Sequence, residues 1–350
     1  MSNNTKTIYW VDFAKIVSMM CVVLLHAGAP ILWAYKNVPI NTWHIANIYG
    51  SMVRMCVPVF FMISGYLLLS KKESMNSFYT KRVVKIVIPL IFWSIVYLLW
   101  IAHCRNTTVQ LKDLVLIIKG PIYAHLWFLY TLIGLYLIIP LLRVFIQNSE
   151  PKEKTLFIVL WFFFVAIIPF FQKIFNVGIG IPGSMVTGYI GYLVVGFVIG
   201  GLKINKKNVC CCTIVFIISI VITAIGTYKF TTENTKFDVY FYDYLSPSVI
   251  IMSASFFVLL KWLGENLTSL QKEVNVKLIT MVSTCSFGVY LSHFLFLDLL
   301  SIGKFGFKLN ALTNNNPLIF IPTTAVAAYI LSLLFTIILR KIPFLKHLVP

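Results

Sequence analysis

The stretch at residues 84–103 reads VKIVIPLIFWSIVYLLWIAH and contains a single charged residue, Lys85. Wound as an α-helix, about twenty residues rise about 30 Å, which is the thickness of the hydrocarbon core of a bilayer. A continuous apolar run of this length exceeds what a buried strand or an amphipathic surface helix requires. The stretch therefore predicts a helix that spans a membrane.

Nine other stretches have the same character and are bounded by charged residues, Pro or Asn. The 350 residues are 59% hydrophobic and 11% charged, whereas a soluble domain averages roughly 45–50% and 25%. We therefore predict an all-α integral membrane protein with about ten transmembrane helices and no large soluble domain. One transmembrane domain is expected over residues 1–350, with spans near 14–35, 48–70, 84–103, 124–146, 155–175, 184–201, 209–228, 247–263, 278–300 and 318–339.

The charge balance is strongly basic, with 29 Lys and Arg against 11 Asp and Glu and a net charge of +18. In a soluble protein this excess would suggest nucleic-acid binding. In a membrane protein, enrichment of cytoplasmic loops in Lys and Arg is the simpler explanation, so we expect no nucleic-acid partner. The cluster between Lys71 and Lys85 weighs most in the orientation. The sequence thus predicts a multi-pass protein of the cell membrane with both termini cytoplasmic, and its many Ile, Asn and Lys residues are typical of an AT-rich bacterium.

The first span shares features with a secretory signal peptide, because Lys6 precedes an apolar core and Ala27-Gly28-Ala29 resembles a cleavage site. Pro30, directly after that site, argues against cleavage. The later spans also need an anchor in the correct orientation. We therefore interpret the segment as a retained helix.

Two groups of small residues are interpreted mainly as packing features. The Gly-rich stretch at 184–201 favours close contact between helices. The seven cysteines show no spacing typical of zinc or of a disulfide framework, and we expect no metal site. Most of them lie in apolar runs, where a thiol packs as a small hydrophobe; lipidation is an alternative for the cluster Cys210, Cys211 and Cys212.

The first span carries Asp12, Lys15 and, eleven positions after Lys15, His26. Eleven residues of helix put His26 about 16 Å above Lys15, roughly halfway across the hydrocarbon core. An ionisable group at that depth usually marks a pathway or a site, and an imidazole exchanges protons at neutral pH. We expect His26 and Lys15 to be catalytic, with Asp12 paired to Lys15; a buried structural histidine and a solvated Asp12 are the alternatives. Any acid that orients His26 would come from elsewhere, and Asp298 and Asp243 are candidates.

A basic run with Lys81, Arg82 and Lys85 follows the second span. A cation cluster of this kind can bind phosphates at the cytoplasmic face, and Arg can do so in bidentate fashion. The alternative is a topology signal. Ser64, near the end of the second span, is a candidate for the site or for a small-residue helix contact.

Five further residues are candidates for an acceptor site or its support. Arg54 and His293 fall in the outer halves of their spans, where an unpaired charge is costly. His125 and Trp127 open the fourth span, and Tyr290 precedes His293 by one helical turn. These groups can bind hydroxyls, stabilise an oxyanion or stack on a sugar. Snorkelling and the interfacial aromatic belt are the alternatives.

Five motifs occur in a fixed order: Lys15-x10-His26, Phe60-Phe61-Met-Ile-Ser64-Gly65-Tyr66-Leu67, Arg82-x2-Lys85 followed by Pro89, His125-Leu-Trp127-Phe128-Leu129-Tyr130, and Phe287-Gly288-Val-Tyr290-Leu291-Ser-His293. Each motif alone is weak. All five, in order on ten predicted spans, resemble the membrane-bound acyltransferase-3 family. The resemblance runs from about Tyr9 to Arg340.

The resemblance implies transfer of an acyl group, usually acetyl, from cytoplasmic acyl-CoA to a hydroxyl of a cell-surface or lipid-linked glycan. In the family the first motif is Arg or Lys, ten residues and a catalytic histidine, which corresponds to His26 with Lys15 as an allowed variant. The family's Arg-x-x-Arg motif is associated with the CoA phosphates and maps onto Arg82 and Lys85, where Lys85 keeps the charge but loses the planar fork. Acetyl-CoA would be a donor substrate, and no permanently bound cofactor is expected.

The chain departs from some family members, which continue after the tenth span into an extracytoplasmic hydrolase-like domain. We therefore expect a stand-alone O-acetyltransferase that acylates the acceptor itself or hands the group to a separate extracytoplasmic transferase, with membrane lipid and a second copy of the chain as further partners. The expected outer loops, near 36–47, 104–123, 172–183, 229–246 and 301–317, are short and favour a small or lipid-linked glycan.

The competing interpretation is a transporter or flippase that moves a polar solute or glycan precursor without acyl transfer. Histidine and arginine inside the membrane would suit a proton pathway. No inverted repeat is apparent in the sequence, and the basic motif at Arg82 would have no role in transport. A purely structural membrane partner would leave every polar residue in the spans unexplained.

Overall fold

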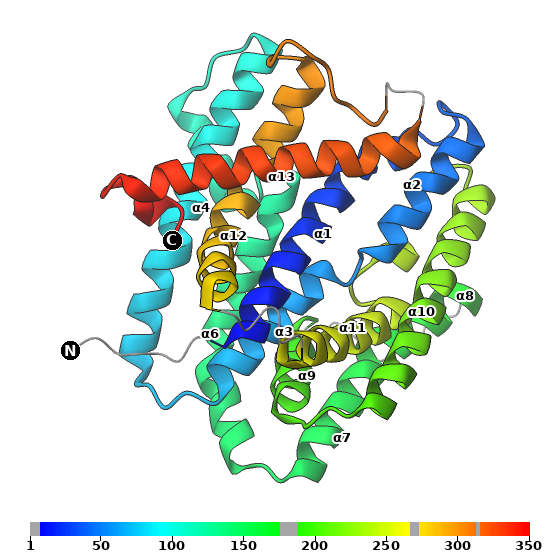
Figure 1. Cartoon of the computed structure of the whole chain (residues 1–350), viewed down its shortest axis with the longest axis vertical. Helices are drawn as coiled ribbons and strands as arrows, with labels where there is room; N and C mark the ends of the chain where they lie inside the picture. The colour runs from blue at the N-terminus through cyan, green and yellow to red at the C-terminus, as the bar shows by residue number, and fades with distance from the viewer. Residues whose placement is uncertain (1–7, 176–187, 267–272, 313–315) are drawn as a thin grey trace.

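The computed structural model describes residues 8–175, 188–266, 273–312 and 316–350 (Figure 1). Within these ranges every regular element is a helix and none is a β-strand. Nine helical segments of the described residues are long and apolar enough to cross a membrane, and a shorter apolar helix, Ile190–Gly201, adds to them. The protein is thus an all-α, multi-pass membrane protein, as its composition predicts.

The long helices are α1 (Tyr9–Trp33), α4 (Met75–Arg105), α6 (Trp127–Asn148), α10 (Lys206–Glu233), α11 (Pro247–Asn266), α12 (Glu273–Ile302) and α13 (Pro317–Lys341). The shorter ones are α2 (Ile40–Met52), α3 (Cys56–Leu69), α5 (Val115–Lys119), α7 (Pro151–Phe162), α8 (Ile168–Phe175) and α9 (Ile190–Gly201). Local chemistry explains two of the starts. Ser74 accepts a hydrogen bond from a backbone N–H at the start of α4, and Asn205 does so at the start of α10. These side chains satisfy amides that a helix N-terminus leaves unpaired.

The second predicted span, 48–70, is built from two helices, α2 and α3, with a turn at 53–55 between them. Pro58, in the first turn of α3, has no N–H to donate to the carbonyl of Arg54 four residues earlier, and a first turn tolerates this loss. Arg54 lies in the turn itself. The first of the two helices begins at Ile40, within residues that we expected to form an outer loop.

Helix α3 packs directly against the short helix α9. A Cβ on Gly65 would overlap the carbonyl of Leu193, and a Cβ on Gly196 would overlap the backbone of Met62. Only glycine permits two backbones to approach so closely. The close packing predicted for the Gly-rich stretch is confirmed at Gly196, while residues 184–187 lie outside the described ranges.

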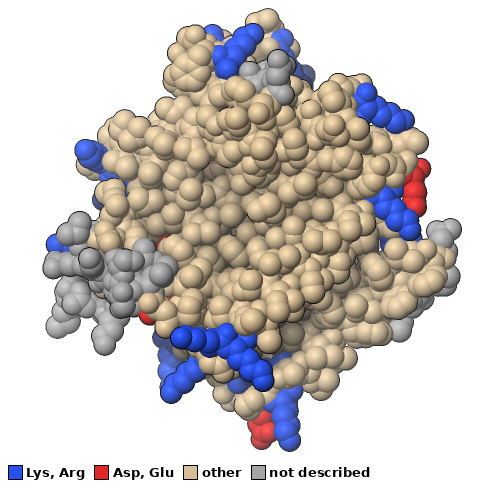
Figure 2. Space-filling model, turned by 45° about the vertical axis from the view of Figure 1, so that its right-hand side comes forward, with Lys and Arg blue, Asp and Glu red and all other residues tan. Residues whose placement is uncertain are grey.

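The surface is apolar over wide areas, as contact with lipid requires. In α10, Ile214, Ile218 and Ile225 are exposed, whereas Thr223 and Thr227 on the other face are fully buried. The apolar face thus points outward and the polar face inward, the reverse of a helix on a soluble protein. Figure 2 shows broad uncharged surface with Lys and Arg grouped at its margins.

Helix α1 lies at the centre of the fold and packs against α2, α3, α11, α12 and α13 (Figure 1). Its neighbours therefore come from both ends of the chain. Ala14, Ser18, Val22 and Val23 of α1 are buried against them. Any site that includes Lys15 and His26 is consequently assembled from helices that are far apart in the sequence.

Candidate functional site

Helices α1, α3, α4, α6, α12 and α13 contribute to the lining of a cavity of about 560 Å³, which we call the basic cavity. Its lining also includes His26 and aromatic and aliphatic side chains. No Asp or Glu is among the described lining residues, so the cations are in excess and the cavity attracts anions. Five cations line it: Lys15, Lys71, Arg82, Lys85 and Arg340.

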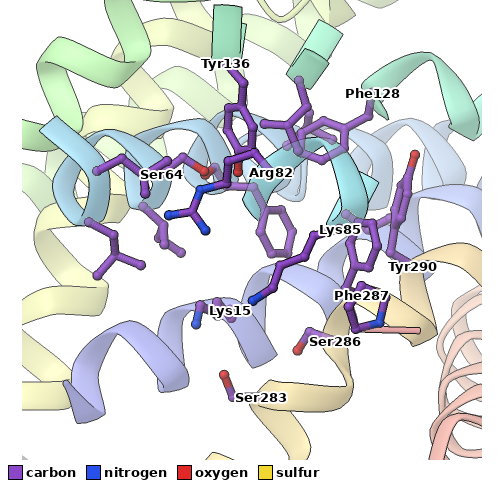
Figure 3. Close-up of a pocket in the computed structure, with 18 of the residues that line it drawn as sticks. Lys15, Ser64, Arg82, Lys85, Phe128, Tyr136, Ser283, Ser286, Phe287 and Tyr290 are labelled. Atoms are coloured by element: carbon purple, nitrogen blue, oxygen red, sulfur yellow. The ribbon is translucent and has the colours of Figure 1, made fainter. Parts of the chain in front are cut away.

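Arg82 and Lys85 point into the basic cavity from α4, and Lys15 faces them from α1 (Figure 3). The guanidinium of Arg82 lies 5.4 Å from the ring centre of Phe78, and its buried Nε has no hydrogen-bond partner among the described residues. Ser64 also lines the cavity, with its hydroxyl donating to a carbonyl of its own helix at 2.9 Å. Neither Arg82 nor Lys85 forms an ion pair in the described part of the chain, so both remain free for a ligand.

Asp12 forms an ion pair with Lys15, which lies one helical turn later in α1. Its carboxylate lies 3.3 Å from the ammonium of Lys15 and accepts hydrogen bonds from the hydroxyls of Ser283 at 2.7 Å and Thr280 at 3.4 Å on α12. Only 8% of Asp12 is exposed. The expected pairing of Asp12 with Lys15 is therefore present, and Asp12 is a buried acceptor instead of a solvated side chain.

Lys81, which we expected beside the donor phosphates, is not among the described residues that line the basic cavity. Its ammonium donates to Glu73 at 2.8 Å, and 60% of its side chain is exposed. Glu73 also lies 3.6 Å from the guanidinium of Arg143, whose Nε donates to the carbonyl of Leu68. The hydrogen bond from Lys81, together with the charges of Lys81, Arg82 and Arg143, lowers the pKa of Glu73 below its ordinary 4.5. These contacts anchor the loop between α3 and α4 at the rim of the cavity.

His26 contacts a second histidine, His293, on α12. His26 Nδ1 lies 3.0 Å from His293 Nε2, and His293 Nδ1 lies 2.7 Å from the carbonyl oxygen of Tyr290. A carbonyl only accepts, so Nδ1 of His293 carries the proton, and with both rings neutral its Nε2 accepts from Nδ1–H of His26. This assignment leaves the lone pair of His26 on Nε2, where it is available to a base or a nucleophile.

A third histidine, His125, lies beside this pair, with its ring centre 5.1 Å from that of His293. It is 1% exposed, and neither ring nitrogen has a hydrogen-bond partner among the described residues. The hydroxyl of Tyr290 donates to the backbone carbonyl of His125 at 2.6 Å. His125, Tyr290 and Trp127 all line the basic cavity. Because an unbonded buried imidazole carries a desolvation cost, His125 is a candidate for direct contact with a ligand.

A second cavity, of about 440 Å³, meets the basic cavity at His26, and we call it the aromatic cavity. Arg54 is the only cation among its described lining residues, with its guanidinium 4.3 Å from the ring centre of Tyr242 and 5.2 Å from that of Tyr244. The buried Nε of Arg54 has no partner in the described ranges. His26, Trp127 and Tyr244 line both cavities. The aromatic walls are Trp33, Trp127, Phe237, Tyr242, Tyr244 and Phe294.

Neither candidate acid orients His26. Asp298 accepts hydrogen bonds from Tyr123 and Trp100, and Asp243 accepts one from the backbone N–H of Leu245. The partner of His26 is instead the neutral imidazole of His293. From the sequence we considered only carboxylates as partners of His26 and therefore missed this role of His293.

Several cavity residues were not singled out by the sequence, among them Lys71, Arg340 and Tyr244. Lys71 and Arg340 looked like ordinary topology signals at helix ends. Burial lowers the pKa of Lys71, because it disfavours the charged ammonium, and the charge of Arg82 lowers it further. Lys71 and Arg340 lie at helix ends on the same predicted side of the membrane as Arg82, and this shared location is the sequence feature that could have indicated them.

The sequence over residues 8–339 matches the profile of the acyltransferase-3 family, which is described as an acyltransferase domain. The protein belongs to the acyltransferase-3 family. No curated protein and no solved structure showed significant similarity to the chain. The acyltransferase-3 match covers all five motifs and both cavities except Pro350 and Arg340, and it makes this protein a membrane acyltransferase.

Proposed function

We propose that the protein is a transmembrane O-acyltransferase that moves an acetyl or other short acyl group from cytoplasmic acyl-CoA to a hydroxyl of a cell-surface or lipid-linked glycan. The observation that carries this proposal is the position of His26, which lines both the basic cavity and the aromatic cavity. A donor in one cavity and an acceptor in the other would meet at a single imidazole.

The basic cavity suits the donor. CoA carries several phosphates and cannot cross a bilayer, so a site for it needs cations at the cytoplasmic end. Arg82, Lys85 and Lys71 would bind these phosphates, with Arg82 able to form two parallel hydrogen bonds. Lys15 would hold the donor about 16 Å below His26 by helical rise, a distance that the extended pantetheine arm can cover.

The chemistry would take place at Nε2 of His26. This nitrogen accepts the proton of the acceptor hydroxyl while the hydroxyl oxygen attacks the thioester carbonyl carbon. The C–S bond breaks, CoA leaves as the thiolate, and the proton on His26 passes to the sulfur. In the alternative route, Nε2 attacks the carbonyl carbon itself, the C–S bond breaks and CoA leaves as the thiolate. The acceptor hydroxyl then attacks the acyl-imidazole, the C–N bond breaks, and the hydroxyl proton passes to Nε2; this route gives ping-pong kinetics. Arg54 and His125, whose buried side-chain nitrogens have no partner among the described residues, are donors available to the carbonyl oxygen.

The aromatic cavity suits a sugar. Its rings offer flat apolar faces, while Arg54 offers hydrogen-bond donors to hydroxyl oxygens. Tyr242, on which Arg54 stacks, is itself fixed because its hydroxyl donates to Asn47, at 2.7 Å from the side-chain oxygen. The lining is therefore held in place before an acceptor binds, which reduces the cost of binding.

Radiolabelled acetyl-CoA supplied to inverted membrane vesicles tests the proposal. We expect label in the glycan fraction with the unchanged protein, and a loss of at least about 100-fold with His26→Ala, because it lacks the base. The matched control is Glu233→Gln, which alters an exposed pair with Lys229 away from both cavities and should label normally. Equal labelling with His26→Ala would overturn the catalytic assignment, and the absence of CoA-dependent label on any glycan would overturn the proposed reaction.

A transporter or flippase is the second candidate, because two cavities that meet at a histidine inside the membrane would also suit alternating access. It predicts movement of an unmodified glycan precursor in vesicles without acyl-CoA. The acyltransferase predicts no such movement and strict dependence of glycan labelling on acyl-CoA.

A further inference from the structure

A third cavity, of about 510 Å³, lies between the last turns of α4 and α12 and the residues just before α6. Trp100, Arg105, Tyr123 and Asp298 line it, and we call it the Asp298 cavity. Figure 1 shows the ends of α4 and α12 side by side, and the hydrogen bond from Trp100 to Asp298 joins them. Apart from Ala124, its described lining residues belong to neither the basic nor the aromatic cavity.

Asp298 is the acid of this cavity, in a transmembrane helix where a carboxylate is costly and usually marks a site. One oxygen, Oδ2, accepts both hydrogen bonds, from the hydroxyl of Tyr123 at 2.6 Å and from Nε1 of Trp100 at 2.8 Å. Burial, and then the bond to Asp298, raises the pKa of Tyr123, so its phenol stays a donor. The other oxygen, Oδ1, has no partner among the described residues, and no described Lys or Arg forms an ion pair with Asp298.

The lining of the Asp298 cavity fits a neutral ligand rich in hydroxyls. Among its described lining residues one acid, Asp298, and one base, Arg105, balance each other, so neither a phosphate nor an ammonium ligand is favoured. Hydroxyls can donate to the free oxygen of Asp298 and accept from Arg105, and hydrogen bonds to charged groups are the stronger ones in proteins. The rings of Trp100 and Tyr123 offer apolar surface to a C–H face. Sugars combine these properties, and the cavity has the volume of a small-ligand site.

We propose that the Asp298 cavity is a second carbohydrate subsite, which holds the sugar unit next to the one that receives the acyl group. The inference rests on the proposed function for that first unit. Ala124 lines both the Asp298 cavity and the aromatic cavity. It lies between Tyr123, which bonds Asp298, and His125, whose ring centre is 5.8 Å from that of Tyr123. The acceptor is therefore a glycan of at least two units, with a neutral unit at Asp298.

Asp298→Asn is the variant that tests the subsite. Its amide oxygen still accepts from Tyr123 and Trp100, while an NH2 group replaces the free carboxylate oxygen. The acceptors are glycans from the envelope of the native host cells, fractionated into one, two, and three or more sugar units, with labelled acetyl-CoA as donor. In the unchanged protein we expect the KM for the acceptor to fall about tenfold from one unit to two, as for one charge-assisted hydrogen bond.

In Asp298→Asn we expect the KM for two-unit acceptors to rise about tenfold. The KM for one-unit acceptors, the KM for acetyl-CoA and kcat should not change, and Glu233→Gln should leave every value unchanged. Thermal unfolding in detergent shows whether Asp298→Asn is folded. Arg105→Gln, at the exposed end of α4, is a second variant that spares the buried bonds of Asp298, and it should raise the same KM several-fold.

The outcomes separate the subsite from the reaction. If the unchanged protein acylates one-unit and two-unit acceptors with equal KM, or if neither variant changes the KM for two units, the subsite is overturned and the acyltransferase stands. A rise of equal size for one and two units also overturns it. If the unchanged protein acylates no fraction at all, the proposed function fails and the subsite fails with it.

Discussion

The basic cavity and the aromatic cavity meet at His26, yet their walls differ sharply in charge. Cations from α1, α4, α13 and the loop after α3 line the basic cavity, whereas Arg54 is the only cation among the described residues that line the aromatic cavity. Asp12 pairs with one of these cations, Lys15, whereas Glu73 binds Lys81 and Arg143. The basic cavity thus keeps most of its charge for a ligand.

This difference in charge indicates how donor and acceptor would be sent to different cavities in the proposed reaction. The imidazole of His26 is common to both cavities, so it cannot by itself distinguish a donor from an acceptor. A polyanionic donor is attracted to the basic cavity only. An acceptor in the aromatic cavity is selected mainly by shape and stacking.

The largest effect is expected where the two cavities meet. His293→Ala removes the acceptor for Nδ1–H of His26, so the ring can take the other tautomer and present a proton instead of a lone pair. We expect kcat to fall about 100-fold, with little change in the KM for acetyl-CoA.

The control is His293→Gln, whose amide oxygen can accept the same hydrogen bond and should restore part of kcat. Rates measured from pH 5 to 9 in labelled transfer assays give the profile of the base in each variant. An unchanged kcat and pH profile in His293→Ala would show that His293 does not position His26.

The next effect should be confined to the basic cavity. Arg82→Ala removes a cation that points into it, and we expect the KM for acetyl-CoA to rise about tenfold while the KM for the acceptor stays constant. Arg82→Lys keeps the charge without the planar fork and should show a smaller rise. The matched control is Lys81→Ala, because the ammonium of Lys81 binds Glu73 outside the cavity. A larger rise for Lys81→Ala than for Arg82→Ala would contradict the assignment.

A smaller effect should be confined to the aromatic cavity. Arg54→Gln removes the one cation among the described residues that line it, and we expect the KM for the acceptor to rise about threefold to tenfold without a change in the KM for acetyl-CoA. The two constants are measured in the same transfer assay. A fall in kcat at constant KM would assign Arg54 to the thioester carbonyl oxygen instead of the sugar.

The smallest effect concerns stability at the rim of the basic cavity. Because the pKa of Glu73 is lowered in the folded protein, its charged form stabilises the fold at pH above its ordinary 4.5, and this contribution is lost as the pH falls through the lowered value. Glu73→Gln should therefore lower the Tm at pH 7 by about 2 °C. Thermal unfolding in detergent should show the difference shrinking below pH 4.5. A difference that is constant with pH would mean that charge is not its cause.

Positions along single helices are the part of the site that could be predicted from the sequence. Lys15 and His26 are eleven residues apart on one helix, so helical rise alone sets their separation. Arg82 and Lys85 are three residues apart and share a face of α4, and both line the basic cavity. Lys81 is four residues before Lys85, so the helical repeat places it on the neighbouring face as well, and its ammonium turns to Glu73 instead. The sequence could not predict this contact with Glu73, which keeps Lys81 out of the cavity lining.

Contacts between distant helices could not be predicted in the same way. His26 and His293 are 267 residues apart, and only the packing of α1 against α12 brings their rings together. The same holds for Asp298, which pairs with Tyr123 from a loop 175 residues away. The turn at 53–55 was also missed, because apolar residues continue on both sides of Arg54 and predict one continuous span.

The contact of α3 with α9 through Gly65 and Gly196 has a consequence for the length of the acyl chain. Phe60, Ile63 and Leu67 of α3 line the basic cavity, on a helix whose backbone rests directly on the backbone of α9. Side chains between two helices can change rotamer and yield, but backbone in contact with backbone cannot. In the proposed reaction, a longer acyl group would therefore have to be admitted by rotamer changes of these side chains and not by a shift of α3.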